Sequence, residues 1–182
     1  MESKTNAPSS EGAPLRCRPQ CPQDEPFLRE VYGSARQDEL ELTGWGPEQR
    51  KLFLDLQFKA MRQGYASQFP RGEFSVLLRG DEPIGLMVVN RAEDELRMVD
   101  IALLPQYRGR GIGSFWLNKL VQEAKAAQKA CRLHVFKGSR PWSLYERLGF
   151  VKIAEDGPFE HLEWRPHDAA SNRASEGFSS GG

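Results

Sequence analysis

Apolar residues recur along this chain at two spacings, one typical of helices and the other of strands. The clearest helical pattern lies between residues 112 and 127, at Ile112, Trp116, Leu117, Leu120, Val121 and Ala124. This spacing predicts a helix with one buried face. The run before it, Met98 to Leu104, is short, mostly apolar and stopped by Pro105, which indicates a strand.

The same reasoning predicts the rest of the chain as an alternation of strands and helices. Strands are expected at 15–18, 74–78, 84–90, 96–104 and 132–136, and a closing hairpin at 150–154 and 161–164. Further helices are expected at 22–35, 47–67 and 141–148, with a glycine-broken loop at 40–47. The helix at 47–67 is expected to bury its apolar residues, Leu52, Phe53, Leu56, Met61 and Tyr65.

A basic, glycine-rich loop, Gln106 to Gly113, joins the central strand to the central helix. Glycines let the backbone approach a bulky phosphate and permit positive φ, which applies to Gly109, Gly111 and Gly113. Arg108 and Arg110 add forked donors suited to phosphate oxygens. The N–H groups of a helix N-terminus also favour an anion. The loop therefore predicts a pyrophosphate cradle, with an ordinary solvated basic turn as the alternative.

Two familiar nucleotide motifs do not fit this loop. A P-loop needs a lysine after its last glycine, but Ser114 follows Gly113. A Rossmann fingerprint needs a third glycine where this chain has Ser114 or Trp116. The pattern that does fit is Arg/Gln-x-x-Gly-x-Gly/Ala, at residues 108–113. At this loop the chain resembles the GNAT acetyltransferase superfamily, whose members hold the acyl-CoA pyrophosphate there.

A second segment strengthens the resemblance. Tyr145-Glu-Arg-Leu-Gly149-Phe150 is similar to the segment that ends the helix after strand five in GNAT enzymes. The order of predicted elements also resembles that family across nearly all of residues 15–166. The resemblance implies an α/β (α+β) fold: a mixed, mostly antiparallel sheet flanked by helices, with strands four and five splayed apart.

The resemblance also implies which residues bind acyl-CoA. Pyrophosphate is expected on Arg108, Gly109, Arg110, Gly111, Ile112, Gly113 and Ser114, and pantetheine on the main chain of Ile101, Ala102 and Leu103. Family members often carry an asparagine where this chain has Gly138, so Ser139 is the neighbouring hydrogen-bond donor to pantetheine.

Tyr145 is the candidate general acid. A phenol with an ordinary pKa of about 10 can protonate a departing thiolate at neutral pH. The alternative is that Tyr145 only packs on the sheet. The general base is less determined, because Arg97 stands where some family members carry a glutamate. Asp100, in an apolar strand, is the candidate catalytic carboxylate, with Glu95 as a neighbour and a water chain as the alternative.

Composition limits the classes of function. The 182 residues suit one domain at 15–166, with polar tails expected to be disordered at 1–14 and 167–182. Lys plus Arg and Asp plus Glu both number 25, and this balance argues against nucleic-acid or membrane-surface binding. No leader or membrane-spanning run is visible, which predicts a soluble, cytoplasmic protein. The three cysteines have no zinc-site spacing and indicate free thiols, so no metal is expected.

Together these features predict an N-acetyltransferase. Acetyl-CoA is the expected co-substrate, and the acetyl group passes to a primary amine by direct attack in a ternary complex. The acceptor is a small molecule or a peptide, and a homodimer is left open. A non-catalytic acyl-CoA-binding sensor or interaction module is the alternative, and nucleic-acid binding on a reused fold is a third possibility.

Overall fold

The computed structural model describes residues 12–138 and 142–166. Most of the two expected tails, and Ser139, lie outside these residues. In chain order the elements are β1 (Leu15–Pro19), η2 (Pro22–Asp24), α1 (Glu25–Ser34), α2 (Gln37–Glu41), α3 (Pro47–Gln68), β2 (Gly72–Arg79), β3 (Glu82–Arg91), β4 (Glu95–Leu103), η3 (Pro105–Tyr107), α4 (Ile112–Ala126), β5 (Ala130–Phe136), α5 (Trp142–Arg147), β6 (Val151–Asp156) and β7 (Phe159–Trp164).

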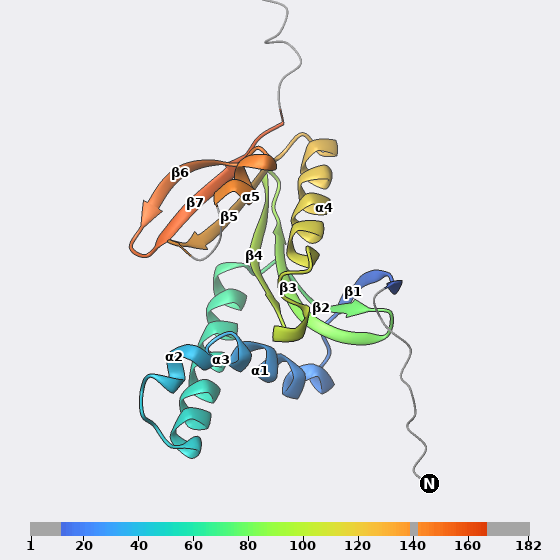
Figure 1. Ribbon diagram of the computed structural model, residues 1–182. Helices are drawn as coiled ribbons and strands as arrows, with labels where there is room; N and C mark the ends of the chain where they lie inside the picture. The colour runs from blue at the N-terminus through green and yellow to red at the C-terminus, as the bar shows by residue number, and fades with distance from the viewer. Residues whose placement is uncertain (1–11, 139–141, 167–182) are drawn as a thin grey trace, which may run out of the picture.

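The strands form one sheet in the order β1-β2-β3-β4-β5-β7-β6. Only β4 and β5 pair in parallel, and every other neighbouring pair is antiparallel. Helix α4 packs along one face, and α1 and α3 lie on the other (Figure 1). This arrangement confirms the predicted mixed, mostly antiparallel sheet flanked by helices.

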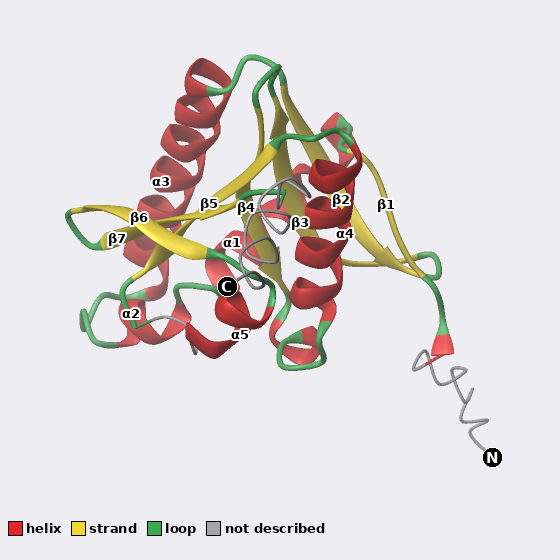
Figure 2. Ribbon diagram, turned by 90° about the horizontal axis from the view of Figure 1, so that it is seen from above, coloured by secondary structure: helices red, strands yellow, loops and turns green. Residues whose placement is uncertain are grey.

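A register shift in β4 decides where the sheet opens. Val88 pairs with Asp100 and Val89 pairs with Met98, so Val99 is an extra residue, a β-bulge. Pairing between β4 and β5 covers only Glu95–Met98 opposite Ala130–Leu133. Beyond Met98 the two strands part, as Figure 2 shows for the ends of β4 and β5. The predicted splay of strands four and five therefore begins at the bulge.

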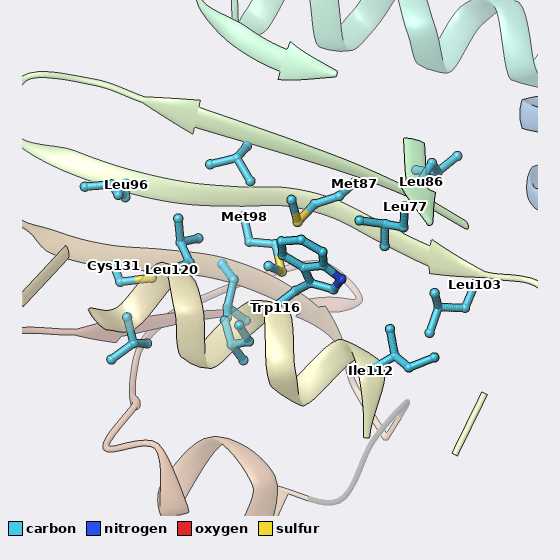
Figure 3. Packing of buried hydrophobic residues seen from close by; sticks show 14 of the residues in the cluster. Leu77, Leu86, Met87, Leu96, Met98, Leu103, Ile112, Trp116, Leu120 and Cys131 are labelled. Atoms are coloured by element: carbon cyan, nitrogen blue, oxygen red, sulfur yellow. The ribbon is translucent and has the colours of Figure 1, made fainter. Parts of the chain in front are cut away.

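Helix α4 supplies much of the core. All six of its predicted apolar positions are buried. Trp116 points from α4 toward Met87 and Met98 of the sheet (Figure 3). Burying large apolar side chains in this way contributes about 1.5–3 kcal/mol each, which fixes the helix, and hence its N-terminus, against β4.

Two expectations for the first helices were wrong. The predicted loop at 40–47 begins with α2, whose Leu40 is buried. In α3 the predicted buried face is misplaced, because Leu52 and Leu56 are 62% and 59% exposed and Phe58 is the buried residue. Only the opposite side of α3 meets α1 and the sheet. None of the described helices is both long and apolar enough to cross a membrane.

Candidate functional site

The loop between β4 and α4 adopts a conformation that glycine favours. Gly109 and Gly111 have φ of 71° and 76°, in the left-handed region, whereas Gly113 lies within the helix. Gly111 is the N-cap of α4, and its carbonyl accepts the first hydrogen bond of the helix, from the Phe115 N–H at 2.9 Å. The N–H groups of Ile112, Gly113 and Ser114 precede that bond and are available to an anion.

Arg108 holds this loop against its neighbours. Its Nε donates to the Leu103 carbonyl at 2.9 Å, and one terminal nitrogen donates to the Ser34 hydroxyl of α1, also at 2.9 Å. A guanidinium carries five N–H donors, so others remain for a phosphate. Arg108 and Arg110 are both exposed beside the positive end of the α4 dipole. The loop therefore concentrates positive charge and N–H donors.

A cavity of about 290 Å³ opens where β4 and β5 part. Met98 to Ile101 line it from β4 and Leu133 to Phe136 from β5. Four further residues line it from the helices, Gly113, Leu117, Leu144 and Tyr145. Of the predicted site residues, Asp100, Ile101, Gly113 and Tyr145 are thus brought to one cavity. Ala102 and Leu103 continue the same splayed strand toward the glycine loop.

Tyr145 is held rigidly at the cavity wall. It is 6% exposed, and its ring meets that of Phe150 edge-on, with centroids 6.4 Å apart. Its carbonyl accepts the Phe150 N–H at 3.0 Å, and Gly149 makes the turn between them with φ of 83°. The Tyr145–Phe150 segment is therefore a compact turn that fixes the position of the phenol.

Asp100 projects toward α1 and α3. Its carboxylate accepts a hydrogen bond from the Tyr65 hydroxyl of α3 at 3.4 Å. Burial raises the pKa of the Asp100 carboxyl, and this effect outweighs the opposing influence of Arg36 and of the Tyr65 hydrogen bond. Burial, together with the nearby Asp100 carboxylate, also raises the pKa of Tyr65. Asp100 is therefore a carboxylate with increased affinity for a proton at the edge of the cavity.

Glu95 is unsuited to the same role. Arg97 contacts it at 2.8 Å, and Arg132 donates to its other oxygen. Burial alone favours a higher pKa, but the two guanidinium groups together lower the pKa of Glu95. Its charge is committed to an ion-pair cluster that also includes Glu163.

His134 also lines the cavity, although it is not among the site residues predicted from the sequence. Its Nε2 lies 2.8 Å from a terminal nitrogen of Arg97, and its ring centroid is 4.1 Å from that of His161 on β7. Partial burial, followed by the charges of His161 and Arg97, lowers the pKa of His134, which favours its neutral form. The alternation of β5 sets His134 on the same face as Arg132, a signal readable from the strand alone.

The described residues contain no cluster of side chains suited to hold a metal ion. Within residues 12–138 and 142–166, no group of three or more His, Cys, Asp or Glu side chains is placed to hold an ion. Cys17 and Cys21 are exposed free thiols, and Cys131 is a buried one. Burial raises the pKa of Cys131 to about 12, which makes it unreactive.

Known proteins share both the sequence pattern and the fold. Residues 70–152 match the family model of the acetyltransferase (GNAT) domain. The chain is 31% identical over 78 residues to the [ribosomal protein bS18]-alanine N-acetyltransferase of Haemophilus influenzae, covering 42% of this chain and 53% of that protein. The chain thus spans about half the length of this curated relative.

Solved structures resemble the whole described fold. The PaiA N-acetyltransferase of Thermoplasma acidophilum, crystallised with coenzyme A, has a TM-score of 0.57 at 22% identity, covering 84% of this chain and 99% of that one. The ribosomal-protein-S18-alanine N-acetyltransferase of Escherichia coli has a TM-score of 0.56 at 18% identity, covering 91% and 99%. At these identities the likeness concerns the fold.

Proposed function

We propose that this chain, whose residues 70–152 match the GNAT acetyltransferase domain, is a member of that family and transfers an acetyl group from acetyl-CoA to a primary amine. The observation that carries the proposal is the cavity at the parting of β4 and β5. It brings together the stretch of β4 that no longer pairs with β5, the first turn of α4, a buried tyrosine and a carboxylate of raised pKa. Acetyl-CoA acts as a co-substrate.

The first part of the proposal is where acetyl-CoA binds. The N–H groups of Ile112, Gly113 and Ser114 and the side chains of Arg108 and Arg110 hold the pyrophosphate. Gly109 and Gly111 permit the close approach of the backbone. Ile101, Ala102 and Leu103 offer their main chain to the pantetheine amides, in the way that an extended peptide adds to a sheet edge.

The second part is the chemistry. The amine nitrogen attacks the thioester carbonyl carbon, a C–N bond forms, and the tetrahedral intermediate collapses with cleavage of the C–S bond. Tyr145 gives its hydroxyl proton to the departing CoA sulfur. The proton lost by the amine passes to Asp100, whose raised pKa makes it the stronger base. Holding both substrates in one cavity supplies much of the rate enhancement.

The acceptor class is a primary amine, and the relative from Haemophilus influenzae suggests where to begin. That protein is named for acetylating an alanine of a ribosomal protein. A peptide with an N-terminal alanine is therefore the first acceptor to test, beside a lysine-containing peptide with a blocked N-terminus, a diamine and an aminoglycoside.

Binding is tested by thermal shift with acetyl-CoA, CoA and NAD. A ligand at about 100 times its Kd stabilises the fold by about 2.7 kcal/mol, and both CoA species are expected to do so while NAD does not. Gly111→Val should abolish the shift. Gly157→Val is the matched control, because Gly157 also has positive φ, 53°, and open space around it, but lies in the β6–β7 turn. Equal acetyl-CoA binding by the two folded variants contradicts the cradle.

Catalysis is tested with Tyr145→Phe. Loss of a general acid typically lowers the rate about 10²–10⁴-fold, so kcat should fall by that factor while acetyl-CoA affinity persists. Tyr32→Phe, at another buried tyrosine, whose ring packs edge-on against Phe58, is the control and should keep its kcat. Unchanged kcat in Tyr145→Phe removes the assigned acid. Binding of acetyl-CoA without transfer to any amine favours the sensor instead.

A further inference from the structure

Helix α3 carries two apolar faces. Leu54, Phe58 and Met61 pack toward the core. Leu52 and Leu56 project from the other side, 62% and 59% exposed. At 3.6 residues per turn these two leucines lie about 40° apart and roughly opposite Leu54 and Met61. Figure 2 shows α3 at the periphery of the molecule, so its outer face is bare.

The two leucines lie between an acidic residue on the N-terminal side of α3 and a basic residue on its C-terminal side. Glu48 lies one turn before Leu52, and Lys59 lies about one turn after Leu56. Neither side chain forms an ion pair with another described residue. Trp45, 38% exposed, precedes the acidic end, where its ring packs on that of Phe53 at 5.2 Å. The outer face is therefore acidic and bulky at one end and basic at the other.

We propose that this outer face of α3 is the contact between two copies of the chain, packed as an antiparallel helix pair about a two-fold axis. In that arrangement Leu52 of each copy meets Leu56 of the other. Glu48 of each copy likewise meets Lys59 of the other. A two-fold contact requires a self-complementary surface, and the pattern of charge and size along α3 meets that requirement. Antiparallel helices also place opposite dipole ends together.

The dimer leaves the candidate site open. The cavity is lined by residues of β4, β5, α4 and α5, and none of its described lining residues belongs to α3. The dimer is therefore independent of acetyl transfer and can be tested without an acceptor.

Sedimentation velocity on the full chain over a concentration series is the first test. One helix pair makes a small interface, below about 1,200 Å², so a micromolar monomer–dimer equilibrium is expected. Leu56→Asp should weaken the dimer about 30-fold or more, the effect of a central hot spot. Val151→Asp is the matched control, because Val151 on β6 is also 59% exposed, and its Kd should not change. Circular dichroism checks that each variant keeps its helix content.

A charge swap separates a second copy from any other occupant. Glu48→Lys and Lys59→Glu should each weaken the dimer several-fold, because each single variant places like charges across the contact. The double variant restores both pairs in reverse order and should return Kd toward the wild-type value. A chain that is monomeric at every concentration overturns the proposal. So does a dimer indifferent to Leu56→Asp, or a double swap no better than the singles, which points to a different protein on this face.

Discussion

Gly85 lies where β3 passes closest to the end of β4. It pairs with Leu103, the last residue of β4. A Cβ added at Gly85 would stand 2.3 Å from the Ala102 carbonyl oxygen and 2.8 Å from Leu103 Cδ2, where ordinary contact begins at 3.4 Å. The first of these atoms belongs to the backbone and cannot rotate away. Gly85→Ala therefore forces the two strands apart by about 1 Å, the difference between these distances.

The expected loss of stability follows from this displacement. Overpacking of a core by one methyl group costs about 1–3 kcal/mol, and a rigid backbone obstacle puts this site at the upper end. The hydrogen bond from the Leu104 N–H to the Ile84 carbonyl, 3.0 Å long, adjoins the pair, and its loss adds about 1 kcal/mol. We expect a total of about 4 kcal/mol, which lowers Tm by about 8–16 °C for a chain of this size.

Urea and thermal denaturation measure the loss, with Gly64→Ala as the control. Gly64 lies within α3 with nothing within 4 Å of the added Cβ, so this variant should gain about 1 kcal/mol from helix propensity. The folded part of the Gly85→Ala population should also bind acetyl-CoA more weakly. The displaced strand end carries Leu103, whose carbonyl accepts from Arg108. A Gly85→Ala protein within about 1 kcal/mol of wild type refutes the reasoning.

Two further predictions concern buried carboxylates and are measured as unfolding free energy against pH. The Asp24 carboxylate accepts hydrogen bonds from both terminal nitrogens of Arg18, each 2.7 Å long, and this pairing lowers the pKa of Asp24. Asp24→Asn should cost about 2 kcal/mol at pH 7, less than a fully buried pair because Arg18 stays partly exposed. The difference should begin to shrink as pH falls below about 4, the ordinary carboxyl pKa, and should vanish only below the lowered pKa of Asp24. A constant difference across this range contradicts the pairing. Asp100 has a raised pKa, so the folded state binds more protons there and wild-type stability falls as pH rises from the ordinary carboxyl pKa through the raised one. Asp100→Asn should therefore be the more stable protein at pH 7 but not near pH 4, and a destabilised Asp100→Asn at neutral pH shows instead that the charge is well compensated.

The elements with one strong apolar period were predictable from the sequence. Helix α4 buries all six of its predicted positions, because one face of that helix meets the sheet and the other meets solvent. The glycine loop was readable for a similar reason: Gly109 and Gly111 adopt a conformation that few other residues take. The roles proposed for these residues, and for Tyr145, stay predictions until ligand binding and kinetics are measured.

The buried face of α3 was not predictable by the same means. Leu52 and Leu56 satisfy a helical period as well as Leu54, Phe58 and Met61 do, so the pattern offers two faces and does not choose between them. The choice depends on which side of α3 packs against α1 and the core, which is a property of the assembled fold. His134 was missed for a related reason, since its place at a cavity depends on where β4 leaves β5.

The β-bulge at Val99 could not be predicted from the apolar pattern, and it determines where the side chain of Asp100 lies. Side chains alternate along a strand, so in a regular β4 the side chain of Asp100 would share the face of Met98 and point into the apolar packing around Trp116. One extra residue reverses the direction of the side chains that follow it. Asp100 is thereby paired with Val88 and directed to Tyr65, while Ile101 pairs with Met87 on the α4 side. The same residue ends the pairing with β5 and opens the cavity. The carboxylate and the cavity thus arise from one insertion in one strand, and this common origin is the physical reason to regard Asp100 as part of the site.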